Sequence, residues 1–355
     1  MITGRFRMFY IIQILIFLLM TKRASCDHQE QVVIGINPSP EPKAIDKQIY
    51  SNLFTYAHLI DISYCISKLG GIEEPFKCDL SCEESFPNMT LIYQWFYDDS
   101  VCGYIATTES NIFNYTDKLS EEKKKKKTIV VSLRGTRSLF DTLADMKVEM
   151  TDYANLRYNL PCCKGCKVHK GFYDNFLHTL SNIHSILEEE LKEDNYEIVF
   201  LGHSLGGSVA LFLALHYLDL GYDKFTLVTM GQPLLGNKKF VDWADQALGS
   251  KKELKHDSFD RKFIRVIHKK DLITTIPAND KILNSYYQFN NQVYLNCSAA
   301  TTDPLPDQVI DCFTGDNSKC IKKDFSNVFD NMYGQYYESH NTYFRKLGLC
   351  GLKIK

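Results

Sequence analysis

The chain has 355 residues, of which 45% are hydrophobic and 24% charged, with 41 basic and 43 acidic side chains. This is the composition of a globular protein long enough to bury a core, and it excludes collagen-like, disordered and polybasic nucleic-acid-binding chains. The 12 cysteines indicate an oxidising compartment.

The first 26 residues have the order of regions typical of a secretory signal peptide. Arg5 and Arg7 precede an apolar run over residues 8–20, and small and polar residues lead from it to Cys26. A helix over residues 8–20 is about 20 Å long, shorter than the ~30 Å hydrocarbon core of a membrane. We therefore predict that residues 1–26 are a signal peptide, that residues 27–355 form one domain, and that the protein is secreted or retained in a secretory or degradative compartment.

The charge balance and the N-glycosylation sequons are consistent with secretion. Loss of the predicted signal peptide removes four basic residues and leaves 37 basic against 43 acidic side chains, which argues against a nucleic-acid partner. N-glycosylation sequons begin at Asn88, Asn114 and Asn296 and predict surface loops.

A cysteine cluster lies in the middle of the chain. Cys162, Cys163 and Cys166, with His169 after them, have part of the ligand spacing of a zinc site. No second Cys or His pair lies at a matching distance, so disulfides are the favoured interpretation and we expect no metal or cofactor. If Cys26 is removed, an odd number of cysteines remains.

The pattern of apolar residues predicts an α/β fold. We expect a helix over residues 50–69, strands over 91–97 and 101–107, and a solvated hairpin tip at the lysine run 123–127. Beyond this run, short apolar strands alternate with helices, which indicates a mostly parallel central sheet with helices on both faces. These strands are expected over residues 128–133, 198–201, 225–230 and 263–267, and the helices over 171–192 and 205–218.

The sharpest motif is Gly-His-Ser-Leu-Gly-Gly over residues 202–207. It directly follows a predicted strand and directly precedes a predicted helix, which is the context of a nucleophile elbow. Small residues flank Ser204 because a tight strand-to-helix turn leaves no room for larger side chains. We predict that Ser204 is a nucleophile, and that His203 is a packing residue of the turn.

The order of residues in this fold places an acid and then a histidine after the serine. His216 would lie about 18 Å from Ser204 along the same helix, and His256 falls in a charged loop. His268 ends a strand next to the acid candidate, so His340 remains as the base. Asp271, just past the strand 263–267, is the expected acid, ahead of alternatives at positions 280, 324 and 330. The oxyanion hole would use the backbone N–H of Leu205 and the N–H and hydroxyl of Thr136, which follows strand 128–133.

Together these motifs resemble the class 3, or filamentous-fungal-type, lipase family of α/β-hydrolases. The motifs that carry the resemblance begin at Ser63, Arg134, Val168, Gly202, Gly231 and Arg265, and end with His340 and Tyr343-Phe344. The resemblance implies Ser204, Asp271 and His340 as the triad, Thr136 and Leu205 as the oxyanion hole, and hydrolysis of carboxylic esters, typically acylglycerols.

The resemblance also implies disulfides and a lid. The implied disulfides join Cys65 to Cys350, Cys78 to Cys82, and Cys297 to Cys312 or Cys320. The lid would span residues 138–151, an amphipathic segment that could close the site in water and contact a lipid surface transiently. The family often has tryptophan where this segment has Thr142, which leaves triacylglycerol preference open.

The sequence is compatible with three functions. The first is a secreted, monomeric serine lipase that cleaves acylglycerols at a lipid–water interface. The second is a phospholipase A or a feruloyl or acetyl esterase, which shares the triad but differs in pocket shape. The third is a catalytically silent secreted binding protein on the same scaffold, against which the complete set of Ser204, Asp271, His340 and Thr136 argues.

Overall fold

The computed structural model describes residues 41–97, 100–113, 126–137, 148–193, 195–250, 261–277, 285–320 and 332–350. Among the sequence predictions that lie outside these residues are the signal peptide 1–26, the sequon residue Asn114, and positions 138–147 of the lid. Positions 123–125 of the lysine run also lie outside them.

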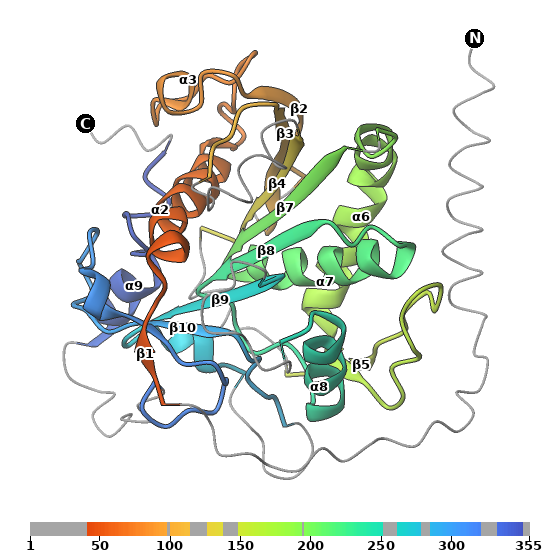
Figure 1. Cartoon of the computed structure of the whole chain (residues 1–355), viewed down its shortest axis with the longest axis vertical. Helices are drawn as coiled ribbons and strands as arrows, with labels where there is room; N and C mark the ends of the chain where they lie inside the picture. Colours follow the sequence, from red (N-terminus) through yellow and green to blue (C-terminus); the bar gives the residue numbers. More distant parts are fainter. Residues whose placement is uncertain are drawn as a thin grey trace.

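The described residues form one large mixed sheet. Its strands are β1 (Lys43–Ala44), β2 (Thr90–Trp95), β3 (Cys102–Thr108), β4 (Lys127–Arg134), β7 (Tyr196–His203), β8 (Phe225–Met230), β9 (Phe263–His268), β10 (Gln292–Leu295) and β11 (Val309–Asp311). They lie in the order β1-β11-β10-β9-β8-β7-β4-β3-β2 (Figure 1). The five strands from β10 to β4 are parallel, and at each side two more strands are joined on by antiparallel pairing.

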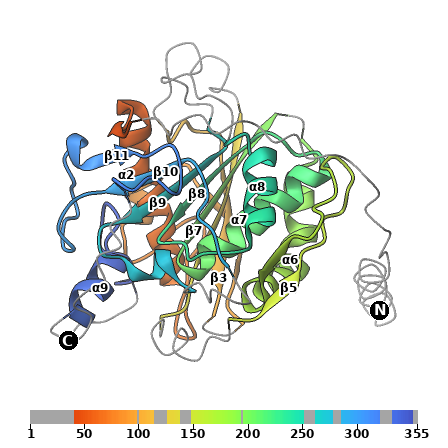
Figure 2. The same cartoon turned by 90° about the horizontal axis from the view of Figure 1, so that it is seen from below.

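Helices cover both faces of this sheet (Figure 2). One face packs against α6 (Lys170–Glu190), α7 (Leu205–Leu220) and α8 (Lys238–Ala247), and the other against α2 (Lys47–Ile62). Successive strand residues alternate between the two cores: Val131 and Phe200 face α7, whereas Val130 and Val199 face α2. Continuous apolar strands are therefore buried on both sides, as the sequence predicts for an α/β fold.

Short elements complete the fold. They are the helices α3 (Cys82–Ser85) and α9 (Met332–His340), the 3₁₀ turns η1 (Ser63–Cys65), η2 (Leu272–Thr275) and η3 (Pro306–Gln308), and the two-stranded sheet of β5 (Met150–Asp152) and β6 (Lys167–His169). The predicted strands and helices are present with shifts of a few residues, but the first helix differs from its prediction. It begins at Lys47, because the Asp46 carboxylate caps it by accepting from the N–H groups of Gln48 and Ile49, and its α-helical part ends at Ile62.

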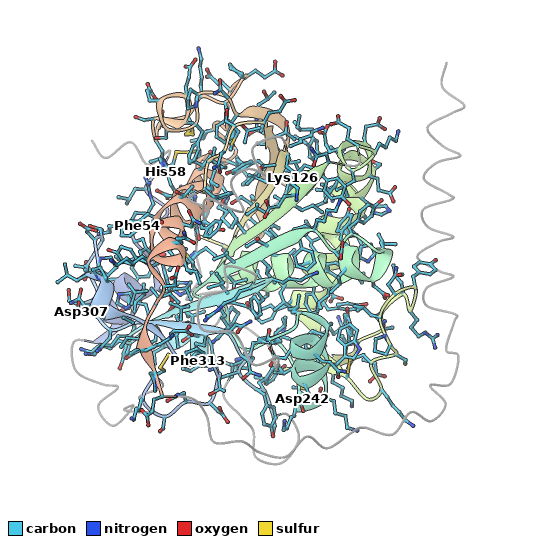
Figure 3. All side chains as sticks on the ribbon, viewed as in Figure 1. Phe54, His58, Lys126, Asp242, Asp307 and Phe313 are labelled. Carbon is cyan, nitrogen blue, oxygen red and sulfur yellow. A yellow bond between two sulfur atoms is a disulfide. The ribbon has the colours of Figure 1, made fainter. Side chains whose placement is uncertain are left out.

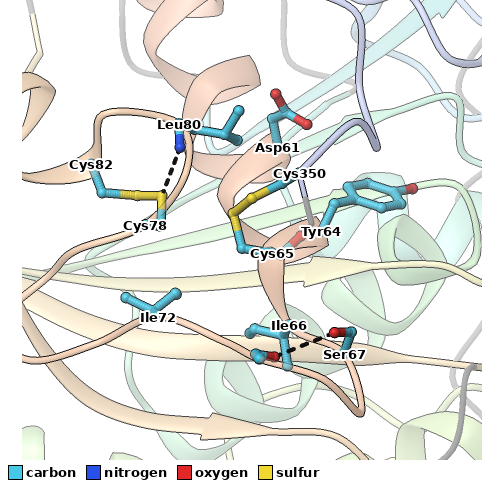
Figure 4. Close-up of a disulfide and its surroundings, with 12 residues drawn as sticks. Asp61, Tyr64, Cys65, Ile66, Ser67, Ile72, Cys78, Leu80, Cys82 and Cys350 are labelled. Carbon is cyan, nitrogen blue, oxygen red and sulfur yellow. Dashed lines mark hydrogen bonds between the residues drawn. A yellow bond between two sulfur atoms is a disulfide. The ribbon is translucent and has the colours of Figure 1, made fainter. Parts of the chain in front are cut away.

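Two of the three implied disulfides are present. Cys65 is bonded to Cys350, 285 residues away, and Cys78 to Cys82 (Figure 4). The first bond joins the end of the first helix to the C-terminal segment. Two further cysteines of the cluster near residue 160, Cys163 and Cys166, are bonded to each other.

The prediction that Cys297 pairs with Cys312 or Cys320 is wrong. Cys312 and Cys320 form a disulfide with each other. The antiparallel register of β10 and β11 explains this: the N–H of Cys312 donates to the carbonyl of Gln292 at the start of β10, whereas Cys297 lies past the end of that strand. Cys297 is a buried thiol, 3.4 Å from Nε2 of His268.

Candidate active site

Ser204 lies in the turn between β7 and α7, at the carboxyl ends of the parallel strands. Its backbone has φ 58° and ψ −130°, a strained conformation for a residue with a side chain. The glycines around it are required by space, since a Cβ at Gly202 would lie 2.3 Å from the carbonyl oxygen of Gly206. A Cβ at Gly206 would lie 2.6 Å from the carbonyl oxygen of Leu133. The strand and helix therefore hold the serine in place by close backbone contact.

The hydroxyl of Ser204 is buried, and its Oγ has no hydrogen-bond partner within the described part of the chain. The N–H of Ser204 donates to the carbonyl of Met230 at the end of β8, over 2.9 Å. This hydrogen bond fixes the backbone of the turn, while the Ser204 hydroxyl makes no hydrogen bond to the described residues. Because α7 begins at Leu205, the positive end of the helix dipole also lies beside the hydroxyl.

Asp271 and His340 form a buried pair. Nδ1 of His340 lies 2.9 Å from both carboxylate oxygens of Asp271, and the hydroxyl of Tyr343 donates to Oδ2 of Asp271 over 2.6 Å. The N–H of Ile273 donates to Oδ1 over 3.0 Å. These contacts orient the imidazole so that Nε2 faces away from the carboxylate; Nε2 is buried and, among the described residues, has no hydrogen-bond partner.

Electrostatics keep this carboxylate charged. Burial alone would raise the pKa of Asp271, but the charge and hydrogen bond of His340 and the hydrogen bond from Tyr343 outweigh it, so that the pKa lies below its ordinary value. Burial and the neighbouring Asp271 charge raise the pKa of Tyr343 well above its ordinary value, so this side chain stays a donor.

His203 has more contacts than its predicted role as a packing residue of the turn requires. Its Nε2 lies 2.7 Å from the backbone carbonyl oxygen of His340, and its Nδ1 lies 2.5 Å from the hydroxyl of Tyr64. The rings of His203 and His340 have centroids 4.6 Å apart. A neutral ring that donates from Nε2 and accepts at Nδ1 satisfies both bonds. Burial and the His340 charge lower the pKa of His203 to about 3, so the ring stays neutral.

The loop after β4 reaches the serine turn. A Cβ at Gly135 would lie 3.0 Å from the backbone nitrogen of Leu205 and 3.1 Å from Cβ of Ser204, so the glycine permits this close approach. Thr136, the next residue, is buried. The guanidinium of Arg134 donates to the carbonyls of Gly135 and Ile66 and holds the loop against η1.

Arg265, on β9, ties together the loops that carry the acid. It is fully buried and donates to the side chain of Gln292 and to the carbonyls of Gln232 and Thr274. Burial lowers its pKa to about 10, so it remains charged near neutral pH. The loop after β8 and the turn η2, which follows Asp271, are thereby fixed to each other.

The imidazoles of the other described candidates have different partners. His268 contacts Cys297 and the carbonyl of Lys269, and His216 packs on Phe176 from α7. His256 and the alternative acids at positions 280, 324 and 330 fall outside the described residues. Over the described ranges, no group of three or more His, Cys, Asp or Glu side chains is arranged to hold a metal ion.

The structure brings together the five residues predicted from the sequence: Ser204 and Leu205 at the elbow, Thr136 on the adjoining loop, and Asp271 and His340 beside it. The sequence alone predicts no bonding role for Tyr64, His203 or Tyr343. The available signals were a tyrosine directly before a cysteine that is bonded across the chain, and a tyrosine three residues after His340. Only the fold shows which polar groups they meet.

An elbow serine on a parallel sheet with helices on both faces defines the α/β-hydrolase class. Residues 130–281 match the family model described as Lipase (class 3). The chain is 30% identical over 305 residues to the secreted mono- and diacylglycerol lipase 2 of Gibberella zeae, which covers 80% of this chain and 71% of that protein. It is 27% identical to Lipase A of Sodiomyces alcalophilus over 86% of this chain and 75% of that protein. The chain belongs to the class 3 lipase family and is a serine ester hydrolase.

Solved structures agree with this assignment. The crystal structure of the Lip2 lipase from Yarrowia lipolytica has a TM-score of 0.69 and 28% identity, and the match covers 88% of this chain and 99% of that one. Lipase II from Rhizopus niveus shares the fold, with a TM-score of 0.62 and 20% identity over 87% of this chain and 99% of that one. In the part of the chain that the structure describes, no helix has the length and apolar character needed to span a membrane.

Proposed function

We propose that this chain is a secreted lipase that hydrolyses acylglycerol esters through Ser204, His340 and Asp271. One observation carries the proposal: Oγ of Ser204 and Nε2 of His340 are both buried without a hydrogen-bond partner among the described residues, while Asp271 fixes the far side of the imidazole. A buried polar atom left unpaired costs about 1–3 kcal/mol, so two of them at one elbow are typical of a site that substrate completes.

The reaction follows from these positions. Oγ of Ser204 attacks the ester carbonyl carbon while Nε2 of His340 accepts the hydroxyl proton. The backbone N–H groups of Leu205 and Thr136 stabilise the oxyanion that forms, and the Asp271 carboxylate stabilises the imidazolium. His340 then gives its proton to the leaving alcohol. Water, activated by the same imidazole, hydrolyses the acyl-enzyme and releases the fatty acid.

The substrate class comes from the relatives. The Gibberella zeae protein is named for mono- and diacylglycerols, and we propose glycerides of this kind for the present chain. A phospholipid, feruloyl ester or acetyl ester remains the alternative. Export through residues 1–26, a monomeric state, a single domain over residues 27–355 and lipid contact through residues 138–151 belong to the same proposal.

Replacement of the nucleophile tests the mechanism. Ser204→Ala should lower kcat on a soluble short-chain ester by about 10⁴- to 10⁶-fold, because the residual rate comes only from binding and the oxyanion donors. Ser208→Ala is the matched control: this serine is also buried on α7 without a hydrogen-bond partner in the described structure, and its loss should leave kcat unchanged. Full activity of the Ser204 variant would remove the proposed mechanism.

A substrate series tests the class. Rates on emulsified mono-, di- and triacylglycerols, phospholipid vesicles and soluble feruloyl and acetyl esters should be highest for the mono- and diacylglycerols. A rise in rate above the solubility limit of the substrate would support lid contact with lipid, since a lid opens only if the lipid binds the open state better. Preference for phospholipid vesicles would replace the glyceride assignment with a phospholipase.

A further inference from the structure

A surface hollow of about 550 Å³ lies on the outer side of α2, apart from the site described above. Aromatic side chains form its wall: the rings of Phe54 and Phe344 are 4.9 Å apart, edge to face, and those of His58 and Phe86 are 5.2 Å apart. Phe54 and His58 project from α2 in Figure 3. The volume is within the range of ligand pockets, about 300–1,000 Å³.

The rim of the hollow is polar and contains a sequon. Asn88 lines the hollow, is exposed, and begins the sequence Asn88-Met89-Thr90. Its Nδ2 donates to Oγ of Ser110 over 2.8 Å, and the N–H of Ser110 donates to Oγ1 of Thr108. Met89 is buried, so the backbone is fixed while the amide of Asn88 faces the hollow. One N–H of that amide has no partner among the described residues.

The charges around the hollow favour a neutral ligand. Its one ionised side chain among the described lining residues is Arg345, whose Nε lies 2.8 Å from the buried carboxylate of Asp61. Burial and the charge of Arg345 lower the pKa of His58 to about 4, so this ring is neutral near physiological pH. A hollow with aromatic walls, neutral polar edges and a compensated cation matches a sugar, which has apolar C–H faces and hydroxyl edges, better than a fatty acid or a phosphate.

We propose that Asn88 carries an N-linked glycan whose first N-acetylglucosamine packs into this hollow. In the transfer, Nδ2 of Asn88 forms a bond to C1 of the sugar, the bond from C1 to the pyrophosphate of a lipid-linked oligosaccharide donor breaks, and the amide loses one proton. The lipid pyrophosphate is the leaving group. The remaining N–H still donates to Ser110. The sugar would cover the half-buried rings of Phe54 and His58. This inference rests on the export that the proposed function includes, and it does not depend on the lipase activity.

The experiment uses the full chain, secreted from a eukaryotic host, with Asn114→Gln and Asn296→Gln so that one sequon remains. Thr90→Ala removes that sequon and leaves Asn88 in place, and Thr90→Ser is the matched control that keeps it. Peptide mass spectrometry should find the glycan on Asn88 in the parent and in Thr90→Ser and not in Thr90→Ala. Tm should be about 2 °C lower in Thr90→Ala than in Thr90→Ser, and the rate on a soluble ester should be the same.

Protection of the glycan tests the contact itself. An endoglycosidase that cuts between the first two sugars should act about tenfold more slowly on the native protein than on the denatured one. Phe54→Leu removes one ring of the wall and should abolish this protection. An unmodified Asn88 in the secreted protein would overturn the proposal, as would a glycan that is cut at the same rate in native and denatured protein.

Discussion

The two faces of the central sheet are built in different ways. On one face, α6, α7 and α8 belong to consecutive strand–helix units, so most contacts join neighbours in the sequence. On the other face, α2 packs against residues 343–350, held by the Cys65–Cys350 disulfide and by the Arg345–Asp61 ion pair. Ser204 sits at the start of α7, whereas His340 and Tyr343 belong to the C-terminal segment. The candidate site therefore combines a nucleophile that is positioned by its sequence neighbours with a base, His340, that is held by contacts between residues far apart in the sequence.

The largest expected effect is a loss of kcat, which should distinguish two buried aspartates, Asp271 and Asp219. Asp271→Asn should lower kcat by about 10⁴-fold with little change in fold, because the amide cannot hold the imidazole in the same tautomer or stabilise its cation. Asp219→Asn is the comparison on the α7 side: Asp219 is equally buried and accepts backbone N–H groups from residues 157–160. That variant should lose stability and keep kcat, as urea unfolding and steady-state rates would show. A normal kcat in Asp271→Asn would redirect the search for the acid.

The next effect tests the disulfide that joins η1 to the C-terminal segment. Double replacement of Cys65 and Cys350 by alanine should lower the free energy of unfolding by about 6 kcal/mol in the chain-entropy model, since the bond closes a loop of 285 residues. The same change at Cys163 and Cys166, three residues apart, should cost about 1.5 kcal/mol. Urea unfolding measures both. Equal losses would show that the long loop does not dominate the stability of the α2 face.

This contrast also explains what the sequence could predict. The elbow is local: the glycines around Ser204 lie within six consecutive residues, and the strand and helix that adjoin them are predicted from the residues directly before and after. The choice of Asp271 and His340 needed the residue order of the fold and exclusion of the other histidines, because the two are 69 residues apart. The pairing of Cys297 that the family resemblance implied was wrong, because Cys312 and Cys320 are bonded to each other and a sequence motif does not reveal the register of β10 and β11.

The hydrogen bonds around His340 could not be predicted from the sequence for the same reason. Tyr64 and His203 are 139 residues apart, and His203 and His340 are 137 residues apart. Nothing in a single chain pattern shows that a histidine beside the nucleophile donates to the backbone of another histidine. Local patterns thus predicted the helices, the strands and the nucleophile, whereas the polar contacts between the two faces required the three-dimensional fold.

A smaller effect concerns the hydrogen bonds that hold the base from the α2 side. Tyr64→Phe and His203→Leu should each lower kcat by about tenfold, with KM nearly unchanged, because the backbone of His340 is then held less firmly while the ester pocket is intact. Tyr50→Phe is a control on α2, the helix that precedes η1, since the Tyr50 hydroxyl donates to the carbonyl of Pro304. A change in KM alone would assign Tyr64 and His203 to substrate binding.

The smallest effect is a change in the pH dependence of stability. The pKa of folded His203 is about 3, because of burial and the His340 charge, whereas an unfolded histidine has a pKa near 6.5. Between these values the unfolded chain binds a proton that the folded chain does not, so the free energy of unfolding falls as the pH is lowered from 6.5 towards 3. At pH 5, His203 should account for nearly one proton, or about 1.4 kcal/mol per pH unit.

His203→Gln should reduce this slope by that one proton while lowering stability at pH 7. Urea unfolding at several values between pH 5 and 6.5 measures the slope, in a range above the titration of Asp271. His58, whose pKa is lowered to about 4 by burial and by Arg345, is present in both proteins, so its contribution cancels in the difference. An unchanged slope would mean that His203 takes up a proton in the folded state near neutral pH. A charged ring could not accept the Tyr64 hydroxyl proton at Nδ1, and the α2 face would then hold the base by a different bond.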